Sequence, residues 1–593
     1  MTDYDILIKN ASIVDGSGNK AYNGSVGVKD GRIRAIGGIG GDADTIIDAS
    51  GLTLAPGFID SHSHAETGLL YYPQCESFVF QGVTSFVGGQ CGMSPGPIGD
   101  EIGFPGAARE HLDKLVKYKF YAEKSIFPRE KVNEIMEQEY GFTVNWYNMA
   151  DYFKVVEERK FTVNYVPLLG HNTVRRYVMG QDYQRHATRP EIDSMSELIH
   201  QGMKDKCIGL SVGLDYDPDV FASREEIVEH VSIINEYGGV FCPHSRRTGR
   251  RRGISAGHKQ HDKIDGILEI LDIIRQSKAR TNIAHIFTGW YVTPQGAPDI
   301  LEQTNKRATL TYIDAALEEG LDISFDVIPP SLPTKFTSHT YLCGLLQPWI
   351  RELSSRAALA EWLKVKDFRE EIKDAIRRGR WFIRVAYNPN TNPRWAENIT
   401  VLQHKIGAYD NKSLQTIAGE LGKDPFDVWL DLIAEDPDSK CALGAGTDQY
   451  ATSHAIFFQH PQSSVGLDTG VDDYKHEGTS QTWCPPGMSS YSAFVGFFDK
   501  FVNKMKALTV EEAVYKTSTQ TAKRHNIKDR GVIQEGAYAD LVVLDVPNMK
   551  VTGTALYPRI KPEGIEYVII NGELVADKGT HTGARPGMVL RRE

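Results

Sequence analysis

The stretch from Leu54 to His64 constrains the fold of this chain more than any other feature. It reads Leu-Ala-Pro-Gly-Phe-Ile-Asp-Ser-His-Ser-His, an apolar run too short for a helix that ends in two histidines one residue apart. Side chains at positions i and i+2 of a strand point to the same side. We therefore expect a buried strand that presents His62 and His64 to one metal ion.

The middle of the chain alternates strand-like apolar runs with helical patterns, which is typical of βα units and a parallel sheet. Helical patterns run, for example, from Arg189 to Lys206 and from Arg224 to Tyr237. This order predicts an α/β fold built on a (β/α)8 TIM-like barrel. The predicted strands are residues 83–87, 164–170, 209–213, 239–244, 281–285 and 322–327.

Both ends of the chain carry short alternating strands broken by glycine-rich turns. We expect residues 1–55 and 525–593 to pair into one small β-sandwich domain, with the barrel domain between them at residues 56–524. A barrel of this kind uses about 250 residues, so the middle region has room for long insertions. We place these near residues 100–146 and 334–424, where they are candidates for a lid or for the contact surface of a homo-oligomer.

Charge and cysteine usage narrow the functional classes. The formal net charge of −11 argues against a nucleic-acid partner. No apolar run is long enough to span a bilayer, and the first residues lack the pattern of a signal peptide, so we expect a cytoplasmic protein with no membrane partner. Seven scattered cysteines suit reduced thiols better than a disulfide framework. Any cysteine with a special role should be a metal ligand or a nucleophile.

Strand ends in the middle region carry side chains that bind metals. The carboxyl ends of barrel strands meet at one mouth, so these residues should come together there. Imidazole, thiolate and carboxylate groups suit zinc, although each residue alone is more often structural. His171, after Leu169-Gly170, is a further candidate whose role is equally well structural. The predicted set is His62, His64, Cys91, His244, His285 and Asp468.

Six segments, in order along the chain, resemble the amidohydrolase superfamily and, within it, the D-aminoacylase (N-acyl-D-amino-acid deacylase) branch. The first is Ala55-Pro-Gly-Phe-Ile-Asp-Ser-His-Ser-His, and the second is Gly89-Gln-Cys-Gly. The others are residues 169–175, 213–218, 465–470 and 529–545. Together they span most of the chain outside the two insertions. The resemblance implies a metal-dependent hydrolase of carbon–nitrogen bonds other than peptide bonds.

The resemblance also assigns roles to the predicted ligands. Cys91, His244 and His285 would hold one tightly bound zinc, and His62 and His64 would form a second, weaker site beside the same cysteine. A metal-activated water would attack a small-molecule amide, and Asp468 would move its proton to the leaving nitrogen. Asp448, in Ala-Gly-Thr-Asp-Gln, is the rival carboxylate, and Asp326 is expected to be a structural hydrogen-bond acceptor.

The substrate pocket is where this chain departs from that branch. The branch has His-x-Lys and Asp-x-Tyr-Pro-Tyr segments that hold the substrate carboxylate, whereas this chain has Phe287 and Ile328 at those positions. Neither side chain can bind an anion, so we expect a more apolar pocket. Tyr216 is retained and can donate one hydrogen bond, and Arg246, in a His-x-Arg position that the branch shares, offers an anion site from another wall.

Other functions remain open on the sequence alone. A genuine N-acyl-D-amino-acid deacylase would also fit the motifs. So would a hydrolase of a cyclic amide, a carbamate or a urea, because the same groups serve all of these reactions. A non-catalytic scaffold with this fold is disfavoured, because no metal ligand and no proton-transferring aspartate is missing from the set.

Overall fold

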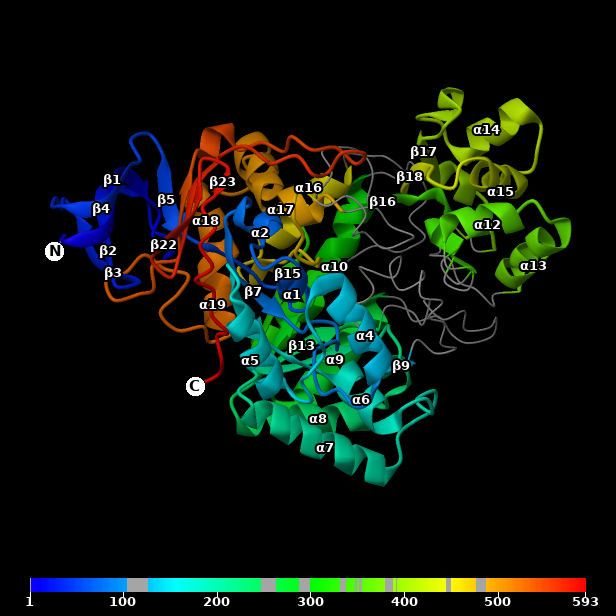
Figure 1. Cartoon of the computed structure of the whole chain (residues 1–593), viewed down its shortest axis with the longest axis horizontal. Helices are drawn as coiled ribbons and strands as arrows, with labels where there is room; N and C mark the ends of the chain where they lie inside the picture. The colour runs from blue at the N-terminus through cyan, green and yellow to red at the C-terminus, as the bar shows by residue number, and fades with distance from the viewer. Residues whose placement is uncertain are drawn as a thin grey trace.

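A computed structural model describes most of the chain. The described residues are 2–103, 126–246, 263–286, 299–330, 338–346, 349–350, 353, 355–378, 388–390, 392–443, 449–475 and 487–593. Within these ranges, no helix combines the length and the apolar character needed to cross a membrane. The architecture mixes helices and strands, as predicted, with parallel strands at the centre of the molecule (Figure 1).

The central strands form two parallel sheets. One has the order β10–β7–β6 and the other the order β11–β12–β13–β14–β15–β19. The residues of these strands are buried almost without exception, which explains why they read as continuous apolar runs. The strands are β6 (Phe58–Asp60), β7 (Val83–Gly88), β10 (Asn164–Pro167), β11 (Leu169–Gly170), β12 (Gly209–Gly213), β13 (Val240–His244), β14 (Arg280–Ile283), β15 (Ile323–Val327) and β19 (Ser463–Val465).

Helices connect successive strands, so the alternation predicted from the sequence is confirmed. Thr188 and Glu191 form a capping box at the start of α7, and Ser223 accepts a hydrogen bond from the Glu226 amide at the start of α8. These caps fix the first turns close to the predicted positions. The helices are α5 (Met149–Arg159), α6 (His171–Met179), α7 (Arg189–Lys204), α8 (Arg224–Glu236), α9 (Lys263–Ser277), α10 (Asp299–Glu318) and α16 (Gln449–Phe458).

Two joints link the parallel sheets to each other. Strands β10 and β11 are separated by Leu168 alone, and the Leu168 amide donates to the Gly88 carbonyl at 2.9 Å. On the other side, the Ser61 amide, just after β6, donates to the Val465 carbonyl of β19 at 3.1 Å. The chain itself therefore joins the two sheets where β10 continues through Leu168 into β11, and a hydrogen bond joins them between the ends of β6 and β19.

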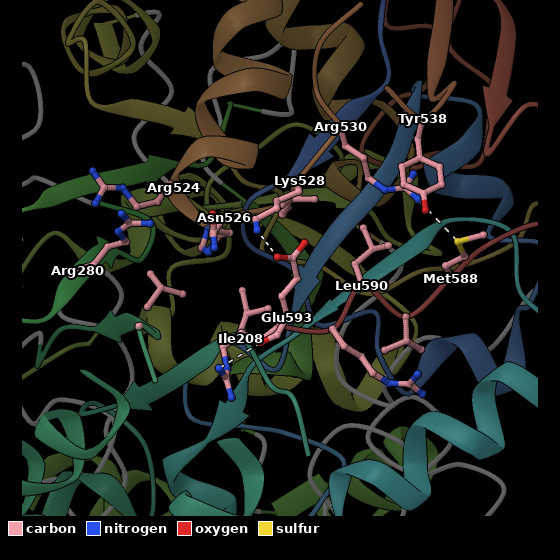
Figure 2. A pocket seen from close by; sticks show the side chains of 17 residues that line it. Ile208, Arg280, Arg524, Asn526, Lys528, Arg530, Tyr538, Met588, Leu590 and Glu593 are labelled. Atoms are coloured by element: carbon pink, nitrogen blue, oxygen red, sulfur yellow. Dashed lines mark hydrogen bonds and ion pairs between the residues drawn. The ribbon is translucent and has the colours of Figure 1, made fainter. Parts of the chain in front are cut away.

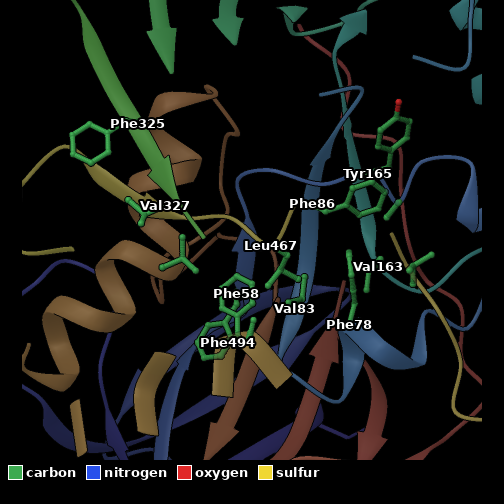
Figure 3. Close-up of a cluster of buried hydrophobic side chains, with 14 of the residues drawn as sticks. Phe58, Phe78, Val83, Phe86, Val163, Tyr165, Phe325, Val327, Leu467 and Phe494 are labelled. Carbon is green, nitrogen blue, oxygen red and sulfur yellow. The ribbon is translucent and has the colours of Figure 1, made fainter. Parts of the chain in front are cut away.

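An aromatic cluster packs around strands β6 and β7. Phe58 stacks on Phe494, with ring centroids 5.4 Å apart, and Phe86 stacks on Tyr165 at 5.2 Å. Figure 3 shows these rings together with Leu467, which comes from the loop after β19. Phe494 belongs to α17 (Ser489–Phe497), so helices near the end of the chain close the core around β6.

The two ends of the chain meet in a single nine-stranded sheet, which Figure 1 shows as blue and red strands side by side. Strand β5 pairs with β20 in antiparallel register, with Leu54 opposite Val543. This sheet has its own buried apolar cluster, which includes Ile8, Val26 and Leu541. Its strands are β1 (Tyr4–Ile13), β2 (Tyr22–Lys29), β3 (Arg32–Gly37), β4 (Ala43–Asp48), β5 (Thr53–Pro56), β20 (Leu541–Leu544), β21 (Ile565–Ile570), β22 (Glu573–Asp577) and β23 (Thr580–His581).

The region predicted as the second insertion, near residues 334–424, has a separate core that extends to Leu443. Trp395, Phe426 and Trp429 pack together in an apolar cluster distinct from that of the parallel strands. The insertion lies at the upper right of Figure 1. Its elements are β16 (Ser338–Tyr341), α12 (Arg356–Trp362), α13 (Lys366–Arg377), β17 (Ile399–Gln403), α14 (Leu414–Leu421), α15 (Pro425–Glu435) and β18 (Lys440–Leu443). The described part of the first insertion contains β8 (Glu101–Gly103), β9 (Ile126–Pro128) and α4 (Arg129–Tyr140).

Candidate metal centre

The predicted ligands lie at or just beyond the carboxyl ends of five parallel strands. His62 and His64 follow β6, and Cys91 follows β7. His244 is the last residue of β13, and His285 lies two residues after β14. Asp468 follows β19. Because parallel strands present their carboxyl ends at one edge, residues more than 400 positions apart in sequence meet there.

Cys91 is the centre of this arrangement. Its sulfur lies 3.4 Å from Nε2 of His62, 3.3 Å from Nδ1 of His244 and 3.4 Å from Nε2 of His285. The two latter nitrogens are 2.9 Å apart. All four side chains are buried, so a thiol and three imidazoles face one another out of contact with bulk solvent.

A second group shares the same cysteine and opens toward solvent. Asp468 Oδ1 lies 3.1 Å from Nε2 of His64 and 3.5 Å from Nε2 of His62. The side chains of His64 and Asp468 are 23% and 31% exposed, whereas that of His62 is fully buried. The carboxylate therefore sits at the boundary between the buried histidines and the side from which a substrate would arrive.

The donor atoms fit a zinc ion. Zinc–nitrogen bonds of about 2.0–2.1 Å and zinc–sulfur bonds of about 2.3 Å, arranged as a tetrahedron, separate the donor atoms by about 3.3–3.6 Å. The distances from Cys91 Sγ to the three imidazole nitrogens fall in that range, whereas the 2.9 Å between His244 Nδ1 and His285 Nε2 would have to lengthen by about 0.4 Å. The donor chemistry, one thiolate with imidazoles and a carboxylate, also suits a borderline-soft ion.

The pKa shifts of Cys91 and Asp468 also favour a cation at this site. Burial opposes ionisation of the Cys91 thiol, but His244, His62 and His285 outweigh it and hold the pKa of Cys91 well below its usual range. Burial likewise opposes ionisation of Asp468, whose pKa is nevertheless lowered by His285 and His64. Thiolate and carboxylate thus require positive charge beside them, which either protonated imidazoles or a metal ion supplies.

Buried carboxylates stand behind two of the histidines. His62 Nδ1 lies 3.6 Å from Asp326 Oδ1, and His244 Nε2 lies 3.8 Å from Asp215 Oδ2. Burial acts against protonation of His62, but Asp326 and Cys91 raise its pKa to about 10. Carboxylates in this position orient metal-binding imidazoles in many sites.

Asp326 also fixes the backbone around the centre. It accepts hydrogen bonds from Asn282 Nδ2 at 2.8 Å and from the His285 amide at 2.7 Å, consistent with the structural role expected of it. Asp215 was missed by sequence reasoning. It lies in the segment that carries Tyr216, where nothing distinguishes it from Asp217.

Three residues of the centre have left-handed backbone conformations. The φ angles are +54° at Cys91, +29° at His285 and +53° at Asp468. Side chains other than glycine rarely adopt this region, and such residues gather at functional sites. Hydrogen bonds hold each one in place: the Cys91 carbonyl accepts from Asn172 Nδ2 at 3.0 Å, the His285 amide donates to Asp326 Oδ1 at 2.7 Å, and the Asp468 amide donates to the His62 carbonyl at 2.8 Å.

His171 lies outside these groups and forms a second buried cluster. Its Nδ1 is 2.7 Å from Asp219 Oδ1, and its Nε2 is 2.8 Å from Nδ1 of His230. Arg175 Nη1 donates to Glu226 Oε1 at 3.3 Å in the same cluster. Asp219 Oδ2 also accepts from the Gly213 amide at the end of β12. His171 thus does not join the Cys91 group.

The predicted substrate contacts are described in part. The Tyr216 ring packs against His244, with centroids 4.5 Å apart, which places it beside the candidate centre. Arg246 donates to Glu269 and to the Val220 carbonyl, so its charge already has a carboxylate partner. Ile328 follows β15 and is half-buried. Phe287 and the rival carboxylate Asp448 lie outside the described residues.

A family profile matches half of the sequence. The profile of the amidohydrolase family covers residues 45–232 and 465–576, which include all of the candidate ligands except His244 and His285. The chain belongs to the amidohydrolase family. The predicted family is therefore confirmed, and the insertion lobe between β15 and β19 lies outside the matched ranges.

Characterised relatives of this amidohydrolase extend over its whole length. It is 27% identical to a D-aminoacylase of Alcaligenes xylosoxydans xylosoxydans, over 99% of this chain and 98% of the relative. It is 26% identical to an N-acyl-D-aspartate deacylase of the same organism, over 99% of this chain and 95% of the relative. These homologues are hydrolases of carbon–nitrogen bonds outside peptides, which confirms the predicted enzyme class.

Solved structures support the same fold. A D-aminoacylase crystal structure matches with a TM-score of 0.69 at 24% identity, over 99% of this chain and all of the other. An N-acyl-D-glutamate deacylase from Bordetella bronchiseptica, complexed with zinc and a phosphonate inhibitor, matches with a TM-score of 0.67 at 24% identity, over 99% of both chains. This amidohydrolase thus shares the mixed α/β fold of those enzymes.

Proposed function

We propose that this amidohydrolase is a zinc-dependent enzyme that cleaves the amide bond of a small molecule. The observation that carries the proposal is the position of Cys91, whose sulfur lies within 3.4 Å of three imidazole nitrogens, beside a carboxylate with access to solvent. Cys91, His244 and His285 would hold one zinc tightly. His62 and His64 would form a second, weaker site that shares the cysteine.

An amide resists hydrolysis because its carbon is a poor electrophile and its nitrogen a poor leaving group. Zinc held by Cys91, His244 and His285 would lower the pKa of the attacking water to about 7 and would polarise the carbonyl oxygen of the amide. Asp468, whose pKa is lowered, is ionised at neutral pH and can accept the proton of the attacking water. It then returns that proton to the leaving nitrogen. Burial of the three histidines around Cys91 excludes bulk water from the centre.

The architecture that supports this chemistry is, in our proposal, a (β/α)8 barrel. If β10 and β11 are counted as one interrupted strand, the two parallel sheets supply eight barrel positions. Their order is β6, β7, β10–β11, β12, β13, β14, β15 and β19. The hydrogen bond from the Ser61 amide to the Val465 carbonyl joins the last position to the first. The barrel would span residues 56–524, and segments 1–55 and 525–593 would form the β-sandwich domain.

The substrate in this proposal carries an apolar group beside the scissile bond. Ile328 directly follows β15, whose Asp326 contacts the metal-site histidines, and Ile328 cannot pair with a carboxylate. Phe287, two residues after His285, has the same character. The names of the relatives favour the second candidate, an N-acyl-D-amino-acid deacylase. In that case Tyr216 and Arg246 would bind the substrate carboxylate.

One experiment tests metal and substrate together. Metal analysis of the purified enzyme should find at least one zinc per chain, and removal of zinc by a chelator should abolish turnover until zinc is restored. A panel of N-acetyl-D-amino acids, neutral aryl or acyl amides, and cyclic amides should show fastest turnover in the neutral acyclic series. Efficient turnover of the charged series alone would establish the deacylase instead.

A further inference from the structure

A cavity of about 260 Å³ lies at the opposite ends of the strands from the metal centre. Ile208, Val240 and Arg280, which line it, lie at or just before the first residues of β12, β13 and β14. Figure 2 shows it from close by, with the segment after α19 (Gln520–Arg524) above and the last residues of the chain below. Val240 and His244 are the two ends of β13, so about 13 Å of strand separates the cavity from the metal centre.

The lining of this cavity is strongly basic. Arg280 and Arg524 lie side by side in Figure 2, and both pair with the same carboxylate, Asp322. Arg592 donates to the carbonyls of Met203 and Tyr237. The lining residues with charged side chains are Arg280, Arg524, Lys528, Arg530, Arg591, Arg592 and Glu593.

Carboxylate partners do not balance this charge. Lys528 pairs with Glu593, Arg530 with Asp540, and Arg591 with Glu157. With Asp322 shared by two arginines, six cationic side chains face four side-chain carboxylates among the described residues, and Arg592 also donates to the backbone oxygen of Glu593 at 3.5 Å. The Nε atom of Arg592 is also buried without a hydrogen-bond partner in the described part of the chain. The cavity therefore has an excess of positive charge and of hydrogen-bond donors.

His525 gives an independent indication of a ligand. It lines the cavity, its side chain is buried, with 3% of the residue exposed, and neither ring nitrogen has a hydrogen-bond partner among the described residues. Burial, together with Arg524 and Arg280, lowers its pKa to about 3, so the ring is neutral at physiological pH and keeps one N–H donor. A buried polar group left without a hydrogen-bond partner is destabilising. Such a donor beside arginines suits an anion.

We propose that this cavity is a binding site for a small organic anion, a carboxylate or a phosphate ester with a short apolar group. Arg280, Arg524 and Arg592 supply charge and donors for the anionic head, and His525 supplies a neutral donor. Ile208 and Leu590, which line the same cavity, pack against the apolar part. The site is separate from the metal centre, and the proposal does not depend on the reaction catalysed there.

The test is anion binding to the full-length protein at constant ionic strength, by isothermal titration calorimetry and thermal unfolding. The probes are phenyl phosphate, inorganic phosphate, butyrate and, as reference, chloride. We expect saturable binding of about one anion per chain, with a rise in melting temperature that follows ligand concentration. Butyrate binding identifies the carboxylate source and phenyl phosphate binding the phosphate source. Either supports the site.

Three variants sharpen the result. Arg592→Gln and Arg280→Gln should each weaken binding about tenfold, the size expected for one charge-assisted hydrogen bond. Glu593→Gln should strengthen binding, because it releases Lys528 from its carboxylate. Arg275→Gln is the matched control, since Arg275 forms a similar ion pair with Glu319 on the surface and does not line the cavity. Absence of saturable binding, or equal weakening by the control, would overturn the proposal.

Discussion

Two buried histidine clusters in this amidohydrolase bring possible metal-ligand atoms within 4.8 Å of one another, but their chemistry differs. One surrounds Cys91, and the other contains His171, His230 and Glu226. In the first, a thiol and imidazole nitrogens point toward a common centre. In the second, each ring nitrogen is already engaged: by Asp219, by the other histidine, or by the Ile192 carbonyl.

Charge separates the two clusters further. Arg175 pairs with Glu226 in the second cluster, so a divalent cation there would lie close to a guanidinium. Asp219 raises the pKa of His171 against the effect of burial, while burial and His171 lower that of His230. A proton shared between His171 and the Asp219 carboxylate supplies the positive charge that this cluster needs. Proximity of ligand-type residues is therefore a weak indicator of a metal, and an account of partners and charges is a better one.

The largest contrast is expected from removal of Cys91. Cys91→Ala should abolish turnover and remove the tightly bound zinc, because three imidazoles converge on this sulfur, while the protein still folds. Metal content by mass spectrometry, circular dichroism and activity are the measurements. Cys207→Ala is the control, since Cys207 is also a buried thiol but its pKa is raised by burial rather than lowered. Retention of both zinc and activity in Cys91→Ala would refute the proposed centre.

A second contrast separates proton transfer from metal binding. Asp468→Asn should keep zinc at the Cys91 site and reduce the turnover rate by about 10²–10⁴-fold, the usual contribution of a positioned acid or base. The rate and the zinc content are measured on the same preparation. Asp448→Asn serves as comparison. If that variant loses activity and Asp468→Asn does not, the proton-transferring carboxylate is Asp448.

The second cluster should respond in stability rather than in metal content. His171→Ala leaves Asp219 without its imidazole partner, so the free energy of unfolding should fall by about 1–3 kcal/mol. Zinc per chain should stay at the wild-type value. Urea unfolding and metal analysis provide the two readings. A variant that loses one zinc per chain would show that both clusters bind metal.

The smallest expected effect is that the loss of unfolding free energy caused by His171→Ala depends on pH. The pKa of His171 is higher in the folded protein than its unfolded value of about 6.5, so the proton stabilises the fold fully below that pH. The contribution disappears as the pH rises through the folded pKa. The destabilisation caused by His171→Ala should therefore be larger at pH 6 than at pH 9. Unfolding in urea at both values measures it, and an equal or reversed difference would contradict a protonated His171.

Many strand and helix positions, and the set of candidate metal ligands, can be predicted from local sequence. Runs of apolar residues bounded by glycine, proline and histidine locate the strands to within one or two residues, as for β12 and β13. Helices α7 and α8 begin at the predicted residues, Arg189 and Arg224, and Thr188 and Ser223 act as their caps. The ligand set is recognisable because each member follows such a strand.

Side-chain direction is what the sequence leaves undetermined. His171 follows a strand as His244 and His285 do, but it is the first residue of α6, and the start of the helix turns its ring toward Asp219. Asp215 has no local signature because its contact with His244 depends on the pairing of β12 with β13. Both outcomes depend on tertiary packing, which spacing along the chain does not encode.

The pairing of β5 with β20 has a consequence for how the protein is made. Leu54 and Val543 are opposite each other, although roughly 490 residues separate them. At about 5–20 residues per second, a ribosome needs roughly 25–100 s to add that length. During this time β5, which leads through Gly57 directly into the strand before His62, has no β20 to pair with. Assembly of the proposed metal centre should thus be a late event, completed only once β20 has been synthesised.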